Sequence, residues 1–409
     1  MQPRAAAATL GFILFAHPGQ ADPSCDASGG GTTSETYTHG RATLSLALDD
    51  PPPDDLKVPI RGRPRLTYSH RDELPEFIRS PHSASFPLVA HARDSSGGTT
   101  DTEEDRNATL TIASYANAAS QLLGERLVSH GAVQFRGLPL ADRADFNAFV
   151  GALGDGWNPI KLAGGGTQRS DVQANVRSAS DEPPEQTIEP HMDMAHSTAH
   201  PKRIAFFCAE GPPPGAGGET ALTDMRGVYA ELERQGIPQT FEARGGIAYH
   251  KRLWSAEYVN HTYTWEKFFF TSNVDDALAE IRKRDPGARV HEHGPGVIDF
   301  IEVLPAVHLH PKTGEPTWFN GVHMNHRSYY EEADHVDTSD GSPMDTSYAD
   351  GTPIPEDTIA AVRRAIWRNS VAVRLETGDL VIVDNMLAAH GRMSWVQPAP
   401  RRVLLTHFG

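Results

Sequence analysis

The feature that most limits what this chain can be is a short motif, His191-Met192-Asp193. In an extended segment, side chains two residues apart point to the same side. His191 and Asp193 can therefore reach one metal ion together, through an imidazole nitrogen and a carboxylate oxygen. A second histidine would complete a set of two histidines and one carboxylate, which leaves coordination positions open on non-haem Fe(II). Because the chain contains 20 histidines, the motif needs support from more distant residues.

That support comes from the C-terminal part of the chain. The apolar run Leu380–Val383 leads into Asp384-Asn385-Met386 and then into His390-Gly391-Arg392. Arg401 follows eleven residues after His390 and opens a further strand-like run. His390 is thus the candidate for the second histidine.

A rival pair with the same spacing is His335 and Asp337. It lies in a stretch rich in Asp, Ser and Gly, and it is far closer to His390 in the sequence than His191 is. We therefore predict that His191, Asp193 and His390 form the metal site, and we keep His335 and Asp337 as the second choice.

Several further stretches follow one another in a characteristic order. They are Gly131–Gly137, His191–Asp193, Gly217–Thr220, Trp318–Asn320, Asp384–Met386 with His390–Arg392, and finally Arg401. In these motifs and their order, the chain from about residue 86 to its end resembles the taurine dioxygenase-like (TauD/TfdA) Fe(II)/2-oxoglutarate oxygenases. It is most similar to the clavaminate-synthase-like and syringomycin-biosynthesis-like members. The resemblance implies a mainly β fold with flanking helices and a double-stranded β-helix (jelly-roll) core.

The resemblance also implies an activity. The family couples oxidative decarboxylation of 2-oxoglutarate to oxidation of a substrate by O2, releasing succinate and CO2. His191, Asp193 and His390 would bind Fe(II) and form the catalytic centre. Relatives with a small residue in place of the aspartate leave room for a halide, so Asp193 favours hydroxylation or desaturation over halogenation.

2-Oxoglutarate needs a partner for its distal carboxylate, and the planar guanidinium of arginine suits two carboxylate oxygens. Arg401 matches the family position after the distal histidine. Its neighbour Arg402 must face the opposite side of a strand, so only one of the two enters the site, and we favour Arg401. Thr220 is similar to the threonine that binds the same carboxylate in the family.

Two other classes of protein stay open at this point. One is a jelly-roll protein that binds a small molecule without turnover, against which the intact triad, Thr220 and Arg401 all argue. The other is a zinc-dependent hydrolase, whose metal site would be drawn from His196, His200, His308, His310 and His323. The chain has no cysteines at zinc-binding spacing, and zinc hydrolysis would give Arg401 no role.

Composition excludes some classes of partner. A net charge of -16 argues against nucleic-acid binding, which calls for a basic face. No apolar run reaches the ~20 residues of a membrane span, and the two cysteines, Cys25 and Cys208, do not suggest a disulfide framework. The expected partner is a small-molecule substrate, and the sequence leaves the oligomeric state open.

The N-terminal region differs from the rest. Residues 1–85 are predicted to be a mostly disordered leader, because Gly, Ser, Thr, Asp and Pro dominate much of it. Arg4 and the apolar run Ala5–Ala16 fit a targeting segment, so a cytoplasmic and an organellar location both stay open. Residues 86–409 are predicted to form the dioxygenase domain.

Periodicity predicts the main elements of that domain. Helices are expected at 112–127, 143–153, 224–233, 273–283 and 355–368, and strands at 132–135, 203–208, 317–320, 371–373 and 380–383. The stretch from Glu331 to Asp357 contains no Lys or Arg and several carboxylates, and it is predicted to be a long mobile loop. It is either a solvated acidic loop or a lid over the site that attracts a cationic substrate.

Overall fold

The computed structural model describes residues 35–46, 57–59, 77–79, 86–94, 111–162, 170–173, 175–259, 263–292, 296–331, 338 and 341–409. One compact unit runs from Ser34 to Gly409. The possible targeting segment, Cys25 and the rival pair His335 and Asp337 lie outside the described residues. Within the described part of the chain, no helix combines the length and the apolar character that a membrane crossing requires.

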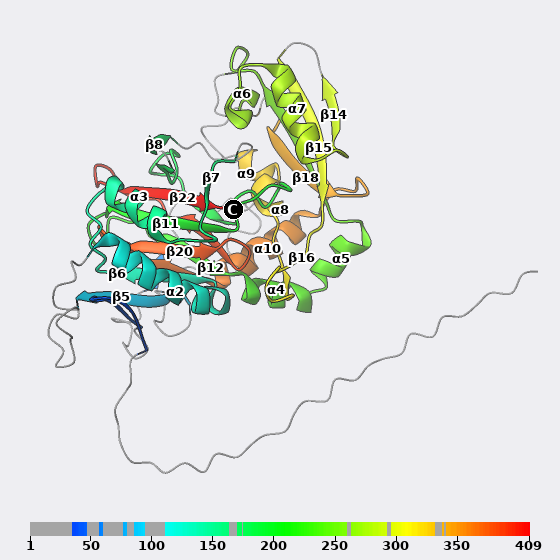
Figure 1. The fold of residues 1–409 in the computed structure, drawn as a ribbon. Helices are drawn as coiled ribbons and strands as arrows, with labels where there is room; N and C mark the ends of the chain where they lie inside the picture. Colours follow the sequence, from blue (N-terminus) through cyan, green and yellow to red (C-terminus); the bar gives the residue numbers. More distant parts are fainter. Residues whose placement is uncertain are drawn as a thin grey trace, which may run out of the picture. The chain divides into compact units, whose positions relative to one another are not determined.

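Two large sheets form the centre of this unit (Figure 1). The first has the order β1 (Thr36–His39), β2 (Ala42–Leu46), β5 (Leu88–Asp94), β6 (Ala132–Arg136), β20 (Leu380–Asp384), β11 (Arg203–Glu210), β22 (Arg402–Phe408), β9 (Val176–Ser178) and β8 (Asp171–Gln173), with β7 (Pro159–Ile160) beside β22. The second has the order β10 (Ile188–His191), β21 (Ala388–Arg392), β12 (Thr220–Asp224), β19 (Ser370–Val373), β4 (Phe77–Arg79) and β3 (Lys57–Pro59).

The chain passes repeatedly between these two sheets. Strands β10, β12, β19 and β21 belong to the second sheet, whereas β11, β20 and β22 belong to the first. A buried apolar cluster joins both, with Ile204 and Phe206 from β11, Leu222 from β12, Val383 from β20 and Leu405 from β22. Two facing sheets linked by alternating strands form the predicted double-stranded β-helix, so the predicted mainly β fold with flanking helices is confirmed.

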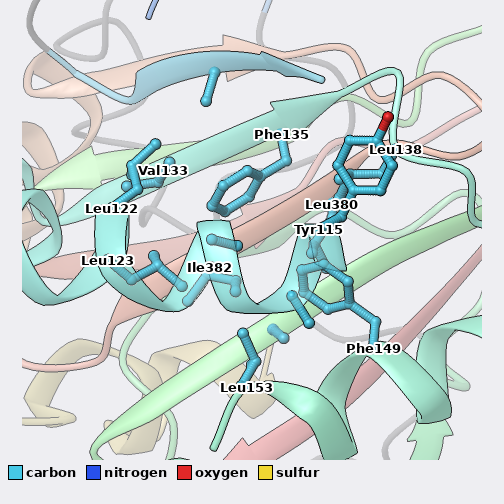
Figure 2. Close-up of a cluster of buried hydrophobic side chains, with 14 of the residues drawn as sticks. Tyr115, Leu122, Leu123, Val133, Phe135, Leu138, Phe149, Leu153, Leu380 and Ile382 are labelled. Carbon is cyan, nitrogen blue, oxygen red and sulfur yellow. The ribbon is translucent and has the colours of Figure 1, made fainter. Parts of the chain in front are cut away.

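Two helices cover the other face of the first sheet. They are α2 (Ile112–His130), which begins at the N-cap Thr111 and ends at Gly131 with φ 74°, and α3 (Arg143–Ala152), capped by Asp142. Figure 2 shows Tyr115, Leu122 and Leu123 of α2 packed against Val133 and Phe135 of β6 and Leu380 and Ile382 of β20. This packing makes the first sheet a rigid base for the strands that carry the site.

A long insertion between β12 and β19 carries a third sheet. Its order is β14 (Arg289–Glu292), β15 (Val297–Leu304), β13 (Ile247–Trp254) and β18 (Met344–Tyr348), and a two-stranded sheet joins β16 (His308–Leu309) to β17 (Pro316–Thr317). The insertion also holds α4 (Met225–Arg234), α5 (Ile237–Ala243), α6 (Trp265–Phe269), α7 (Val274–Arg284), α8 (Val322–Asn325), α9 (Ser328–Glu331) and α10 (Glu356–Arg368). The sequence predicted α4, α7 and α10 but not this sheet.

The prediction of a disordered leader is wrong for part of residues 1–85. Strands β1 and β2 form a hairpin that extends the first sheet through β5, and Tyr37, Leu44 and Leu46 are buried in its core. The composition of this region did not indicate the hairpin, because its apolar residues are few. Those few residues nevertheless lie on the buried side of the strands. The remaining leader lies outside the described residues, apart from Glu35 and the short strands β3 and β4.

Two further predictions need correction. Trp318, Phe319 and Asn320 follow β17 without continuing it, and all three are buried. Trp318 and Phe319 belong to a buried apolar cluster that includes other residues of the insertion. The acidic stretch is not one long loop, because β18 (Met344–Tyr348) pairs along β13. Most of its earlier residues lie outside the described part of the chain, and the lid remains a prediction.

Candidate functional site

Two neighbouring strands of the second sheet bring the predicted histidines together. His191 ends β10, His390 lies in β21, and the two residues are paired in the antiparallel register. Their rings lie 4.7 Å apart between centroids. Gly391 permits this close approach, because a Cβ at that position would lie 2.6 Å from the carbonyl oxygen of Ile188.

Asp193 is held by a side chain from the loop after β20. Asn385 is fully buried, its Oδ1 accepts from the Asp193 N–H at 2.9 Å, and its Nδ2 donates to the Asp193 carbonyl oxygen at 2.9 Å. The same Nδ2 donates to the carbonyl oxygen of Pro201 at 2.9 Å. Asn385 thus fixes the turn that follows β10, and with it the direction of the Asp193 carboxylate.

These constraints produce a compact group of three potential metal ligands. His191 Nε2 lies 3.3 Å and His390 Nε2 lies 3.7 Å from Asp193 Oδ1. One ligand atom from each residue lies within 4.8 Å of those from the other two, and among the described residues no other group of three His, Cys, Asp or Glu side chains does this. The histidines considered for a zinc site therefore form no such group within that part of the chain.

The hydrogen bonding of His191 also fits the binding of a divalent metal. His191 Nδ1 lies 2.9 Å from the carbonyl oxygen of Glu189, so a proton on Nδ1 leaves the Nε2 lone pair directed to the site. His191 Nε2 is buried and has no hydrogen-bond partner. A buried nitrogen in this state is costly unless a ligand satisfies it, and two imidazoles with one carboxylate are the set that Fe(II) accepts with positions left open.

A histidine that the sequence analysis missed contacts the second oxygen of the Asp193 carboxylate. His407 in β22 lies with Nε2 2.7 Å from Asp193 Oδ2, and it is buried. Such a donor orients a ligating carboxylate and tunes its basicity. The available signal was weak: His407 is a polar residue within the otherwise apolar run of the last strand. Asn385 had a similar signal, at the end of the apolar run Leu380–Val383.

A cavity on one side of the triad contains Thr220 and Arg401. Its lining residues are Ala179, Ser180, Ile188, His191, Phe206, Thr220, His390, Gly391, Arg392, Arg401 and Val403. Arg401 Nη2 lies 3.5 Å from Thr220 Oγ1, and Arg401 Nε donates to the carbonyl oxygen of Gly218 at 2.7 Å. Burial, followed by the neighbouring Arg392, lowers the pKa of Arg401 to about 10, so its guanidinium stays charged at neutral pH.

A second guanidinium lines the same cavity. Arg392 donates to the carbonyl oxygens of Glu182, Pro183 and Gln186 at 3.1, 2.6 and 2.8 Å. Burial lowers its pKa to about 10, and the Glu182 carboxylate opposes that shift. The guanidinium carbons of Arg392 and Arg401 lie 4.6 and 5.6 Å from the ring centre of Trp395. Two buried positive charges beside the triad suit an anionic co-substrate.

The two adjacent arginines are separated as the strand geometry requires. Arg401 enters the cavity, whereas the side chain of Arg402 is 69% exposed and its Nη2 lies 3.8 Å from Glu210 Oε2 on the surface. Of these two arginines, only Arg401 lines the cavity beside the triad.

A second cavity lies against the triad and shares Ile188 and His191 with the first. Its lining residues are Glu182, Ile188, His191, Met192, Asp193, Met194, His196, Tyr263, Gly321, Met324, Asn325, Tyr329, Tyr330 and Met344. Many of them come from the insertion, from the region of α6, α8, α9 and β18. The insertion therefore supplies a wall of the space next to the predicted metal site.

The chain is similar to known proteins. The family described as "Taurine catabolism dioxygenase TauD, TfdA family" matches residues 94–407. A clavaminate synthase-like protein of Arabidopsis thaliana is 28% identical over 355 residues, which cover 85% of this chain and 97% of that protein. The dapdiamide synthesis protein DdaC of Enterobacter agglomerans is 24% identical over 294 residues, covering 69% of this chain and 84% of that protein.

Solved structures of such proteins are also similar. PvcB, an Fe, alpha-ketoglutarate dependent oxygenase from an isonitrile synthetic pathway, has a TM-score of 0.43 and 15% identity over 88% of this chain and 93% of its own. A taurine dioxygenase from Burkholderia xenovorans has a TM-score of 0.39 and 16% identity over 80% and 89%. Because the family match spans most of the sequence, the chain belongs to the TauD/TfdA family, and the predicted enzyme class, a non-haem Fe(II)/2-oxoglutarate-dependent dioxygenase, is confirmed.

Proposed function

We propose that this protein hydroxylates a small organic substrate and releases succinate and CO2 from 2-oxoglutarate. The observation that carries the proposal is the position of the triad between two cavities that share His191. One cavity contains two buried guanidinium groups, and the other has a largely apolar and aromatic wall. Two co-substrates of different character therefore have separate places beside one metal site.

His191, Asp193 and His390 would hold Fe(II), which supplies, when bound, the redox chemistry that couples O2 reduction to oxidation of the substrate. The protein's own contribution is to fix these ligands. Asn385 fixes the turn at Asp193, and His407 donates to the second carboxylate oxygen. Such partners preserve ligand geometry while the open coordination positions stay available.

Arg401 and Thr220 would bind the distal carboxylate of 2-oxoglutarate. The guanidinium is oriented by the Gly218 carbonyl oxygen, which accepts from Nε and leaves the Nη groups for a ligand. Thr220 Oγ1 lies beside Nη2 and can donate its proton to the same carboxylate. Because the site is buried, a charge-assisted bond here is stronger than in water.

The second cavity would hold the substrate next to the metal. Asp193 and His191 are among its lining residues, so a bound molecule would lie beside the triad. The largely apolar wall excludes water, which limits side reactions during oxidation.

The test is Fe(II)-dependent formation of succinate from 2-oxoglutarate under air. We expect a panel of amines, amino acids and sulfonates to contain compounds that stimulate succinate formation, and the oxidised product to carry one oxygen from O2. His390→Ala should abolish the reaction, whereas Arg402→Gln should not. Binding of 2-oxoglutarate without succinate formation from any member of the panel would instead favour a binding protein without turnover.

A further inference from the structure

The second cavity has a chemical character of its own. We propose that it is a subsite for a positively charged alkylammonium group, so that the substrate of this enzyme is a cationic amine; the inference rests on the proposed function. Three kinds of observation support it: the arrangement of tyrosine rings, the thioether groups and the sign of the lining charges.

Three tyrosines of the cavity wall form adjacent panels. The rings of Tyr263 and Tyr330 lie 5.3 Å apart at 89°, and those of Tyr329 and Tyr330 lie 5.4 Å apart at 76°. All three tyrosines line the cavity, and their nearly perpendicular rings bound it in different directions. The π face of an aromatic ring attracts a cation, and recognition of alkylammonium groups by several such rings is the main functional use of this interaction.

Four methionines complete the soft part of the wall. Met192 and Met194 flank Asp193, and Met324 and Met344 come from the insertion. The Tyr330 hydroxyl donates to Met344 Sδ at 3.2 Å, which fixes the ring that stands between the other two tyrosines. Thioethers are polarisable and pack against methyl or methylene groups without demanding hydrogen bonds. The wall therefore suits alkyl groups on nitrogen.

The charged side chains that line the cavity are negative. Glu182 and Asp193 line it, and among its described lining residues there is no Lys or Arg. Two buried cations lie behind the wall. Lys251 donates to the His196 carbonyl oxygen at 3.2 Å and is in direct contact with Glu302, and Arg392 donates to the Glu182 carbonyl oxygen at 3.1 Å from the first cavity. A sulfonate or carboxylate in this cavity would have no guanidinium partner among the lining residues, and an unpaired buried anion is costly.

The experiment compares probes that differ in charge but not in shape. The full-length protein, loaded anaerobically with Fe(II) and 2-oxoglutarate, is titrated with choline, with its neutral carbon isostere 3,3-dimethyl-1-butanol, and with isethionate as an anion that carries no ammonium group. A second matched pair is putrescine and 1,4-butanediol. Binding is followed through the change in the metal-to-ligand charge-transfer band and, independently, by ligand-observed NMR.

We expect at least one cation to bind about tenfold more tightly than its neutral isostere, as stacking on tyrosine faces predicts, and isethionate not to bind. Tyr330→Leu should remove that preference, Tyr330→Phe should retain most of it, and Glu182→Gln should weaken it. Tyr258→Leu is the matched control, because Tyr258 is 56% exposed and lies outside the cavity. An unchanged band with 2-oxoglutarate in each variant shows that the fold and the metal site persist.

Three results would overturn the inference while the 2-oxoglutarate band forms normally: equal affinity for the members of both pairs, tighter binding of isethionate, or no binding of either cation. Failure of the proposed function looks different, because the band itself would then be absent before any probe is added. That outcome would remove the inference together with the function on which it rests.

Discussion

Glu189 and Arg363 form an ion pair in the interior, with Arg363 Nε 3.0 Å from Glu189 Oε2 and both side chains 1% exposed. The same guanidinium donates to Ser328 Oγ at 3.1 Å and to the His323 carbonyl oxygen at 3.0 Å. Glu189 lies two residues before His191, whereas the segment from His323 to Ser328 leads through Met324 and Asn325, which line the second cavity. One residue of α10 thus joins the strand of the metal site to the wall of the cavity beside it.

Removal of this arginine should destabilise the protein strongly. Arg363→Met leaves the Glu189 charge buried without its guanidinium, and loss of one partner of a buried pair costs about 3–5 kcal/mol. Urea unfolding of both proteins measures the change. Arg368→Met is the matched control on the same helix, since Arg368 is 55% exposed and pairs with Glu231 at the surface, where the loss is at most ~1 kcal/mol. Equal effects of the two substitutions would contradict this account of α10.

Arg401 and Arg402, which begins β22, should differ in their effect on the binding of 2-oxoglutarate. Arg401→Gln removes a charge-assisted partner from the buried cavity and should weaken binding by about 2–4 kcal/mol. Arg402→Gln changes only a surface contact and should leave the Kd nearly unchanged. Anaerobic titration of the Fe(II) protein with 2-oxoglutarate measures both. If Arg402→Gln has the larger effect, the assignment of the inward residue is wrong.

Gly218 should be required for the position of Arg401. A Cβ at Gly218 would lie 2.7 Å from Arg401 Cδ, and its φ of 77° is unfavourable for other residues. Gly218→Ala should therefore raise the Kd for 2-oxoglutarate. Gly215→Ala separates the two causes, because Gly215 has a φ of 80° but nothing within 4 Å of its Cβ position. Both substitutions should lower the melting temperature, but only Gly218→Ala should weaken the binding of 2-oxoglutarate.

His407 should contribute to metal affinity although it is not a ligand. His407→Leu removes the donor 2.7 Å from Asp193 Oδ2, and loss of such a partner lowers metal affinity about 10–100-fold. His250→Leu serves as the control, because His250 bonds Ser347 Oγ at 2.9 Å in the third sheet, away from the triad. Anaerobic Fe(II) titrations of both variants give the comparison, and similar affinities in the two would show that the contact has no role at the metal.

The sequence could predict the triad because its three residues lie in short, locally readable motifs. The residues of His191-Met192-Asp193 share one strand-and-turn segment, and the apolar run before Asp384 marked the strand that leads to His390. Adjacent residues of a strand face opposite sides, so only one of Arg401 and Arg402 could enter the site. Arg401 could be preferred because it matches the family position after the distal histidine. The helices at α2, α4, α7 and α10 were predictable from their apolar spacing.

The remaining features depend on contacts between residues far apart in the chain. The third sheet forms from β13, β15 and β18, whose pairing no local pattern encodes. The partners of Asp193 come from distant parts of the chain, Asn385 from the loop after β20 and His407 from β22. The N-terminal hairpin was hidden by a polar composition, since only the side chains that face the core need to be apolar. Arg363 lies in a predicted helix, but no local pattern indicates its ion pair with Glu189, which lies 174 residues earlier in the chain.

The most direct test of the central claim is the anaerobic absorption spectrum of the protein with Fe(II) and 2-oxoglutarate. The triad with open coordination positions and the Arg401–Thr220 cavity should together produce a metal-to-ligand charge-transfer band that appears only when both are added. His191→Ala should abolish the band, and His250→Leu should leave it unchanged. A normal band in His191→Ala would contradict the assignment of the metal site, and the absence of a band in the unaltered protein would contradict the proposed function itself.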